Sequence, residues 1–215
     1  MKRGENMKKL LLSAVVFAAS TIGAYAAGTK TAVFAGGCFW CVESDFESLK
    51  GVKEVVSGYT GGKNANPTYK TIGSHIEAVK IFYDPSVISY ETLVDKFFRS
   101  VDPTDAGGQF CDRGNSYTTA IFANGASERA IAEKAIAAIN ASGKLPKKVV
   151  TPVRNASKFY DAEDYHQDYY KQTSKVLTRF GRITKASAYK KYRKGCGRDE
   201  RVKQLWGSDA AFVGG

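Results

Sequence analysis

Two cysteines near the start of the chain have residue types and spacing suited to redox or nucleophilic chemistry. Cys38 and Cys41 stand three positions apart in the stretch GGCFWCVE, with Phe39 and Trp40 between them. Such a C-x-x-C pattern is compatible with half of a zinc site, with a redox-active dithiol, or with a single nucleophilic cysteine.

Zinc fits the rest of the sequence poorly, and a dithiol fits it only in part. A structural zinc site takes four ligands, usually from two paired clusters. The other candidate ligands are scattered singly along the chain: Cys111, Cys196, His75 and His166. We therefore expect no metal site. Dithiol enzymes usually carry small residues between the two cysteines, whereas these two are large. A thiol–disulfide oxidoreductase that uses the Cys38–Cys41 pair remains the alternative function.

The residues around Cys38 favour a nucleophile at the start of a helix. The apolar run over residues 29–35 predicts a buried strand, and Gly36 and Gly37 predict a tight turn after it. Apolar residues then recur at helical spacing up to Leu49. Backbone N–H groups at a helix N-terminus stabilise an anion by about 0.3–1 kcal/mol. An ordinary thiol near pH 7 is only a few per cent thiolate, and we expect the helix N-terminus to raise that fraction several-fold at Cys38.

The remaining patterns predict an α+β fold with two layers. Further strands are expected at 53–57, 77–83, 117–123 and 149–153, and helices at 89–101, 126–140 and 161–171. This order is compatible with a ferredoxin-like split β-α-β core. Two long loops, 58–70 and 102–116, are the expected active-site loops. After residue 171 the pattern is weak, and we expect a largely irregular C-terminal tail.

The first 26 residues have the pattern of a secretory signal peptide. Basic residues precede an uncharged apolar run over 10–23, and Ala24-Tyr25-Ala26 follows with small residues at the two positions that a signal peptidase reads. We expect cleavage before Ala27. Residues 27–215 would then form a single catalytic domain with a basic tail, exported and periplasmic, with no stable membrane insertion after cleavage.

The excess of positive charge does not indicate a nucleic-acid partner. The formal net charge is +11, and it falls to +8 without the first 26 residues, which carry four basic residues and one acidic residue. Much of the excess lies within residues 179–203. For an exported chain, a solvated basic surface explains this composition better than a nucleic-acid groove does. We expect a monomer that binds no nucleic acid.

Four sequence blocks together resemble one enzyme family. They are GGCFWCVE, GYTGGKNANPTY (58–69), HIEAVKIFYDPSVIS (75–89) and GCGRD (195–199), and they keep their order over residues 31–206. The chain thereby resembles the A-type peptide methionine sulfoxide reductases. The resemblance implies reduction of methionine S-sulfoxide, free or in oxidised proteins under repair, to methionine. It also implies no cofactor, with reducing equivalents from a thioredoxin-like dithiol.

The same resemblance assigns roles to the residues around the nucleophile. The Cys38 thiolate would attack the sulfoxide sulfur, and Glu77 would donate a proton to the oxygen, which requires a buried carboxyl with a raised pKa. Tyr69 and Tyr117 would donate hydrogen bonds to the sulfoxide oxygen, and Asp112 would help position it. Phe39 and Trp40 would make apolar contact with the S-methyl group.

Recycling of the oxidised enzyme would use a second cysteine. Attack leaves Cys38 as a sulfenic acid, and Cys196 in GCGRD matches the family's recycling cysteine. On this basis we expect a Cys38–Cys196 disulfide, with the glycine-flanked tail swinging toward Cys38. Cys41 is a candidate second resolving thiol. Cys111 could also accept a disulfide, but we favour its interpretation as a buried small residue, and we interpret His166 as structural.

Overall fold

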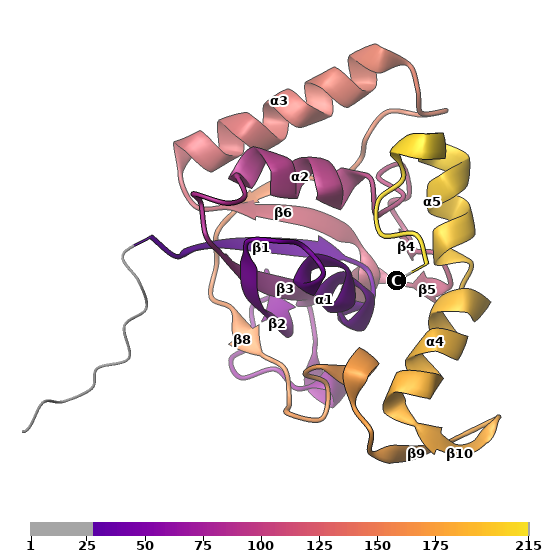
Figure 1. The fold of residues 1–215 in the computed structure, drawn as a ribbon. Helices are drawn as coiled ribbons and strands as arrows, with labels where there is room; N and C mark the ends of the chain where they lie inside the picture. Colours follow the sequence, from indigo (N-terminus) through magenta and orange to yellow (C-terminus); the bar gives the residue numbers. More distant parts are fainter. Residues whose placement is uncertain (1–27, 215) are drawn as a thin grey trace, which may run out of the picture.

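The computed structural model describes residues 28–214 and is built around one mixed six-stranded sheet (Figure 1). Its strand order is β7-β6-β1-β3-β2-β8. The central order β6-β1-β3-β2 is antiparallel throughout, and β7 pairs with β6 in parallel. This is the expected ferredoxin-like split β-α-β core. The strands are β1 (Lys30–Gly36), β2 (Val52–Thr60), β3 (Ile76–Tyr83), β6 (Thr119–Ala123), β7 (Val153–Asn155) and β8 (Tyr160–Asp161).

Three helices belong to this core: α1 (Phe39–Glu47), α2 (Tyr90–Phe98) and α3 (Ala126–Ser142). Alternate residues of β1 face opposite sides of the sheet. Phe34 packs against Phe46 of α1 and Phe97 of α2, with ring centroids 5.7 and 5.1 Å apart. The N-cap of α2 is Ser89, as expected, and its hydroxyl accepts a hydrogen bond from the N–H of Thr92 at 3.0 Å.

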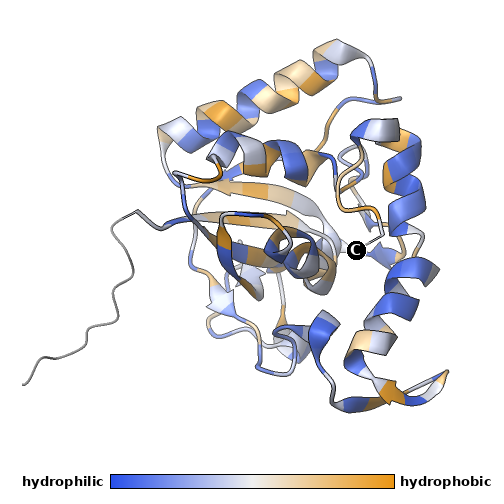
Figure 2. Cartoon of the chain, in the orientation of Figure 1, coloured by the Kyte–Doolittle hydropathy of each residue, from blue (hydrophilic) through white to orange (hydrophobic). Residues whose placement is uncertain are grey.

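The C-terminal segment is more regular than the sequence indicated. A hairpin of β9 (Lys175–Thr178) and β10 (Gly181–Thr184) leads into α4 (Lys185–Gly195) and α5 (Arg198–Trp206). Figure 2 shows α4 as largely hydrophilic. Because its side chains are mostly basic and polar, it lacks the apolar periodicity that identifies a helix in sequence. The expectation of a largely irregular tail is therefore wrong for this segment.

The two long loops carry short elements that fix their conformation. The first contains the 3₁₀ turn η1 (Tyr69–Thr71), whose N-cap Thr68 exchanges hydrogen bonds with Thr71. The second contains β4 (Gly108–Gln109), β5 (Asp112–Arg113) and η2 (Asn115–Tyr117). Two further 3₁₀ turns are η3 (Tyr169–Lys171) and η4 (Gly207–Asp209). The helix expected over 161–171 is wrong, because the end of β8, turns and η3 cover this range. Within residues 28–214, no helix has the length and apolar character needed to cross a membrane. The predicted signal peptide lies outside the described residues.

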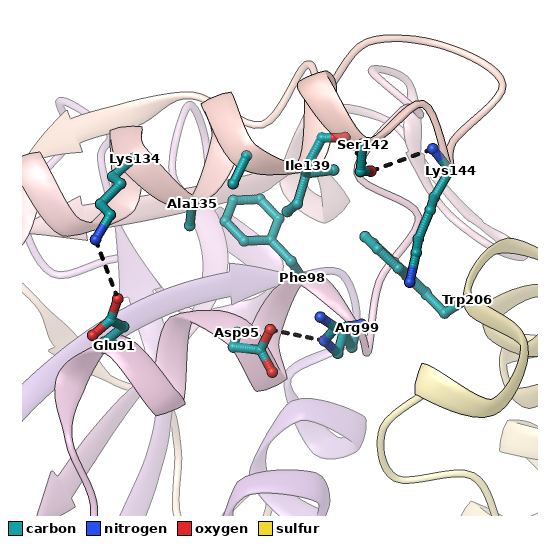
Figure 3. A pocket seen from close by; sticks show the side chains of 11 residues that line it. Glu91, Asp95, Phe98, Arg99, Lys134, Ala135, Ile139, Ser142, Lys144 and Trp206 are labelled. Atoms are coloured by element: carbon teal, nitrogen blue, oxygen red, sulfur yellow. Dashed lines mark hydrogen bonds and ion pairs between the residues drawn. The ribbon is translucent and has the colours of Figure 1, made fainter.

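A hollow of about 280 Å³ lies between α2, α3 and the end of α5 (Figure 3). Phe98, Ile139 and Trp206 line it, and two ion pairs, Lys134–Glu91 and Arg99–Asp95, cross its edge. It contains no cysteine, and none of its residues lines the cavity around Cys38. The hollow and that cavity are therefore separate.

Candidate active site

Cys38 occupies the turn between β1 and α1. Gly37, with φ of +84°, reverses the chain, and a Cβ there would lie 2.6 Å from the Cβ of Gln109, so both conformation and space require glycine. Cys38 is the N-cap of α1, and its carbonyl accepts hydrogen bonds from the N–H groups of Cys41 and Val42. The expected arrangement of strand, glycine turn and helix is confirmed.

A cavity of about 50 Å³ opens over the Cys38 sulfur. Since a water molecule takes up about 30 Å³ in the liquid, this space suits a small terminal group and not a whole side chain. It collects residues from β1–α1, both long loops, β3 and α4. They are Cys38, Phe39, Trp40, Tyr69, Glu77, Asp112, Tyr117 and Tyr192. The fold thus brings together seven residues that the sequence analysis singled out and one that it did not.

Glu77 lies on β3, directly below the start of α1. Its side chain is 2 % exposed, and its Oε2 accepts a hydrogen bond from the N–H of Phe39 at 3.0 Å. Burial raises the pKa of Glu77 to about 8, against the opposing effect of that hydrogen bond. At neutral pH the carboxyl is therefore mainly protonated and able to donate a proton.

The burial of Cys38 acts against the expected effect of the helix N-terminus. Its side chain is 6 % exposed, and burial raises the pKa of the thiol well above its ordinary value, helped by the neighbouring Cys41 and Glu77. A helix N-terminus contributes at most about 1 kcal/mol in the other direction, so burial prevails. Burial thus opposes the rise in thiolate fraction that the helix N-terminus was expected to give.

Two tyrosine hydroxyls converge on the same cavity from separate loops. Tyr69 in η1 and Tyr117 in η2 have hydroxyl oxygens 3.4 Å apart. Burial raises the pKa of each tyrosine, so both groups stay protonated and can donate hydrogen bonds. The backbone N–H of Tyr69 donates to Oε1 of Glu163 at 3.0 Å, which holds the first loop over the sheet.

Aromatic packing fixes the apolar wall of the cavity. Trp40 stacks on Tyr169 with ring centroids 3.9 Å apart and planes inclined by 12°. Its indole N–H donates to Nδ1 of His166 at 3.2 Å. Burial lowers the pKa of His166 to about 4, so the imidazole is neutral and can accept. Phe39, 1 % exposed, packs 5.0 Å from the His166 ring. These contacts are consistent with a structural role for His166.

Tyr192 completes the cavity and was not singled out from the sequence. It lies on α4, which runs beside β5 in Figure 1, and its hydroxyl donates to the carboxylate of Asp112. The same side chain lines the cavity together with Cys38. One signal could have identified it: Tyr192 is four residues before Cys196, on the same face of a helix. No helix was expected there, so this signal was lost.

The chain matches the family model described as peptide methionine sulfoxide reductase over residues 30–200. It is 47% identical over 210 residues to peptide methionine sulfoxide reductase MsrA 2 of Rhizobium meliloti, covering 97% of this chain and 98% of that protein. It is 52% identical over 147 residues to the MsrA of Listeria innocua, covering 66% and 83% of the two chains.

Two solved structures resemble the fold described above. Methionine sulfoxide reductase A of Corynebacterium diphtheriae superposes with a TM-score of 0.59 at 32% identity, over 67% of this chain and 75% of that one. Mxr1 of Saccharomyces cerevisiae in reduced form gives 0.62 at 28% identity, over 66% and 84%. The chain belongs to the peptide methionine sulfoxide reductase family. Its reaction is the reduction of methionine sulfoxide, with reducing equivalents taken from thiols.

In this reductase, Cys196 is bonded to Cys111, and Cys38 and Cys41 are free and buried. The expected Cys38–Cys196 disulfide is therefore not the one present. Cys111 is also not a buried small residue, because it is exposed and bonded across 85 positions. The disulfide lies next to the reductase cavity, since Cys111 precedes Asp112 and Cys196 follows Tyr192 by one helical turn.

Buried ion pairs anchor the segment that carries Cys196 in this reductase. Arg193 contacts Asp45 of α1 at 2.6 Å and Asp199 at 2.8 Å. Arg198 lies 3.5 Å from Asp45 and donates to the carbonyl of Gly36 at 3.3 Å. Cys196 thus lies between Arg193 and Arg198, which are held by Asp45 of α1 and by the carbonyl of Gly36. It does not lie on the loose tail that the flanking glycines indicated.

Two groups of side chains within residues 28–214 have donor atoms close enough together for a metal ion. One is Cys111, Asp112 and Cys196, and the other is Glu43, Glu47 and Asp168. In the first group, both sulfurs are joined in a disulfide and neither is available as a thiolate ligand. Neither group includes Cys38 or Cys41, so the C-x-x-C pattern has no partner cluster in this part of the reductase.

Proposed function

We propose that Cys38 reduces the S epimer of methionine sulfoxide by attack on its sulfur. In the balanced step, the Cys38 thiol and the sulfoxide give methionine and Cys38 sulfenic acid, so the cysteine sulfur is oxidised and the substrate sulfur is reduced. One observation supports this proposal most directly: Cys38, Glu77 and the aromatic side chains of Phe39 and Trp40 line the same small cavity.

Glu77 is the proton donor to the sulfoxide oxygen in this mechanism. The oxygen leaves the substrate sulfur only as it is protonated, and a carboxyl with a pKa of about 8 holds a proton at neutral pH. The partial positive charge on the sulfoxide sulfur favours the Cys38 thiolate once substrate is bound. Tyr69 and Tyr117 donate hydrogen bonds to the oxygen, and Asp112 helps position it, together with Tyr192.

Substrate selection rests on the aromatic wall. Phe39 and Trp40 contact the S-methyl group, whose burial favours methionine sulfoxide over polar sulfoxides of similar size. Trp40 is held by Tyr169 on one side and by His166 at its N–H, so the wall is already in place before substrate arrives.

Recycling proceeds through Cys196 and then Cys111. Cys196 attacks the Cys38 sulfenic acid, water leaves, and a Cys38–Cys196 disulfide forms. The Cys111 thiolate then attacks the Cys196 sulfur, which frees Cys38 and gives the Cys111–Cys196 disulfide. Cys111 is exposed at this stage, so a thioredoxin-like dithiol can reach and reduce the bond.

Mass spectrometry of disulfides after one equivalent of substrate tests this order. Wild type should yield the Cys111–Cys196 disulfide, and Cys111→Ser should accumulate Cys38–Cys196. A Cys38–Cys41 disulfide as the main product in wild type would instead support the alternative, a thiol–disulfide oxidoreductase. Cys41→Ser is the control, because this route predicts normal recycling without Cys41.

We also propose that the enzyme is exported, with cleavage before Ala27. The support is the pattern of residues 1–26, with a basic start, an apolar run and Ala24-Tyr25-Ala26. In the periplasm the chain would meet oxidised proteins and an exported reductant. Purification from the periplasm of a bacterial host should give a mature N-terminus at Ala27. Recovery of the intact chain from the cytoplasm would contradict the proposal.

A further inference from the structure

A second pocket adjoins the cavity over Cys38. It has a volume of about 260 Å³ and shares two residues, Trp40 and Tyr192, with that cavity. One aromatic wall therefore separates the reacting centre from the second pocket, which we call the flanking groove. Its other boundaries come from the C-terminal segment: Tyr169 of η3, the tip of the β9–β10 hairpin, and Ala188 and Tyr189 of α4.

The flanking groove is apolar within and basic at its rim. Phe180 at the hairpin tip forms its outer wall and is 50 % exposed. The guanidinium of Arg179 and the ammonium of Lys191 lie 4.8 and 4.7 Å from the centroid of this ring. These cation–π contacts hold the ring against the groove. An exposed aromatic wall that is held in place in this way is typical of a surface that receives an apolar partner group.

We propose that the flanking groove binds a large apolar or aromatic side chain located two residues from the methionine sulfoxide in an unfolded polypeptide. In an extended peptide, side chains two positions apart point to the same face and are spaced by roughly 7 Å. One such side chain can therefore enter the cavity over Cys38 while the other enters the flanking groove across Trp40. The inference rests on the proposed function and adds a substrate preference to it.

The size of the flanking groove supports this occupant. Pockets that enclose a drug-sized ligand span roughly 300–1,000 Å³, so about 260 Å³ is sized for one large side chain. The wall that the two pockets share, Trp40 and Tyr192, indicates that the occupant belongs to the substrate. A natively folded protein rarely exposes two apolar side chains in an extended strand, whereas an unfolded one does.

Steady-state kinetics with short peptides and dithiothreitol test the proposal. The probes are acetylated tetrapeptide amides with phenylalanine or alanine two residues from the methionine sulfoxide, on either side, and N-acetyl methionine sulfoxide methylamide. Wild type should show a kcat/KM about tenfold higher for a phenylalanine peptide than for its alanine counterpart, which corresponds to burial of roughly half of a phenylalanine ring.

Two variants outside the catalytic cavity should remove this preference. Phe180→Ala opens the outer wall, and Ala188→Phe fills the space. Each should bring the phenylalanine and alanine peptides to similar kcat/KM values and leave the small amide unchanged. Leu177→Ala is the matched control, since Leu177 lies on the same hairpin, is 81 % exposed and does not line the groove; it should keep the preference.

The proposal is overturned if wild type shows no preference, or if the two variants affect all substrates equally. It is also overturned if Phe180→Ala and Ala188→Phe act only when a thioredoxin-like protein replaces dithiothreitol, because the groove would then dock the reductant. If wild type fails to reduce even the small amide, the proposed function itself fails, which distinguishes the two results.

Discussion

Cys38 and Glu77 are both buried acids, and burial acts on both in the same direction by favouring the neutral form. The reaction needs one of them charged and the other neutral. Only the state with a Cys38 thiolate and a protonated Glu77 is productive. The pairing of these residues came from resemblance to the family, but their protonation in the free enzyme depends on burial, which the sequence does not show.

This arrangement predicts a bell-shaped pH profile for the single-turnover rate. The rate should rise toward pH 8 as the thiolate fraction grows, and fall at higher pH once both groups have lost their protons. Glu77→Gln cannot donate a proton, so it should lower the rate by about 10²–10⁴-fold and lose the fall at high pH. Rapid-quench measurement of methionine formed checks both effects.

Glu43 supplies the matched control for this experiment. Glu43 is also buried, and burial raises its pKa to about 8. Its carboxyl oxygens accept hydrogen bonds from the Ser57 hydroxyl and the N–H of Asp168, and it does not line the cavity over Cys38. Glu43→Gln should keep both limbs of the profile. Loss of the high-pH fall in Glu43→Gln, or its retention in Glu77→Gln, would contradict the assignment of the proton donor.

At the scale of elements, α1 connects the nucleophile with the recycling segment. Cys38 begins this helix, and Asp45 near its end binds Arg193 of α4 across 148 positions. The sequence allowed prediction of β1, β2, β3 and β6, of the glycine turn and of α3, because apolar periodicity and glycine mark them. It did not allow prediction of α4 and α5, because these helices are held by arginine contacts whose partners are distant in the chain. Tyr192 and the Cys111–Cys196 pairing were missed for the same reason.

Asp45→Asn tests this connection. Both partners are almost fully buried, with side chains 0 and 4 % exposed, and loss of one charge from a buried pair typically costs about 3–5 kcal/mol of stability. Chemical denaturation should show this loss. Turnover should slow at recycling, while methionine formation in a single turnover stays close to wild type, since Asp45 does not line the cavity.

The control for this element is the pair between Asp95 of α2 and Arg99, the residue that follows this helix, which is much more exposed than the pair at Asp45. Asp95→Asn should change stability by less than about 1 kcal/mol, because exposed pairs contribute little. If Asp45→Asn were no more destabilising than Asp95→Asn, the buried contacts would not be what holds the recycling segment on α1.

At the scale of the whole molecule, three cysteines take part in the redox cycle: Cys38, Cys196 and Cys111. Because the final disulfide joins Cys111 and Cys196, Cys38 is left free to reduce a second substrate molecule. Fully reduced wild type without added reductant should therefore form a second equivalent of methionine. Cys111→Ser should stop after the first equivalent, with Cys38 held in its disulfide with Cys196. Amino-acid analysis of methionine per enzyme measures this stoichiometry.

A Cys111→Ser enzyme that still forms the second equivalent would contradict the relay. Cys41→Ser should match wild type in the same assay, which separates Cys41 from the relay. The sequence supported one resolving cysteine through the GCGRD block. It could not identify Cys111 as the partner, because their contact depends on how the second long loop meets the end of α4.

The most direct test of the central claim is single-turnover reduction of methionine sulfoxide by wild type and Cys38→Ser, with a sulfenic-acid trap present. Wild type should form methionine, and Cys196→Ser, which cannot resolve the sulfenic acid, should form methionine and carry the trap on Cys38. Cys38→Ser should form no methionine above background, whereas Cys41→Ser should behave as wild type does. Methionine formation by Cys38→Ser, or trapping on Cys41 in place of Cys38, would contradict the account.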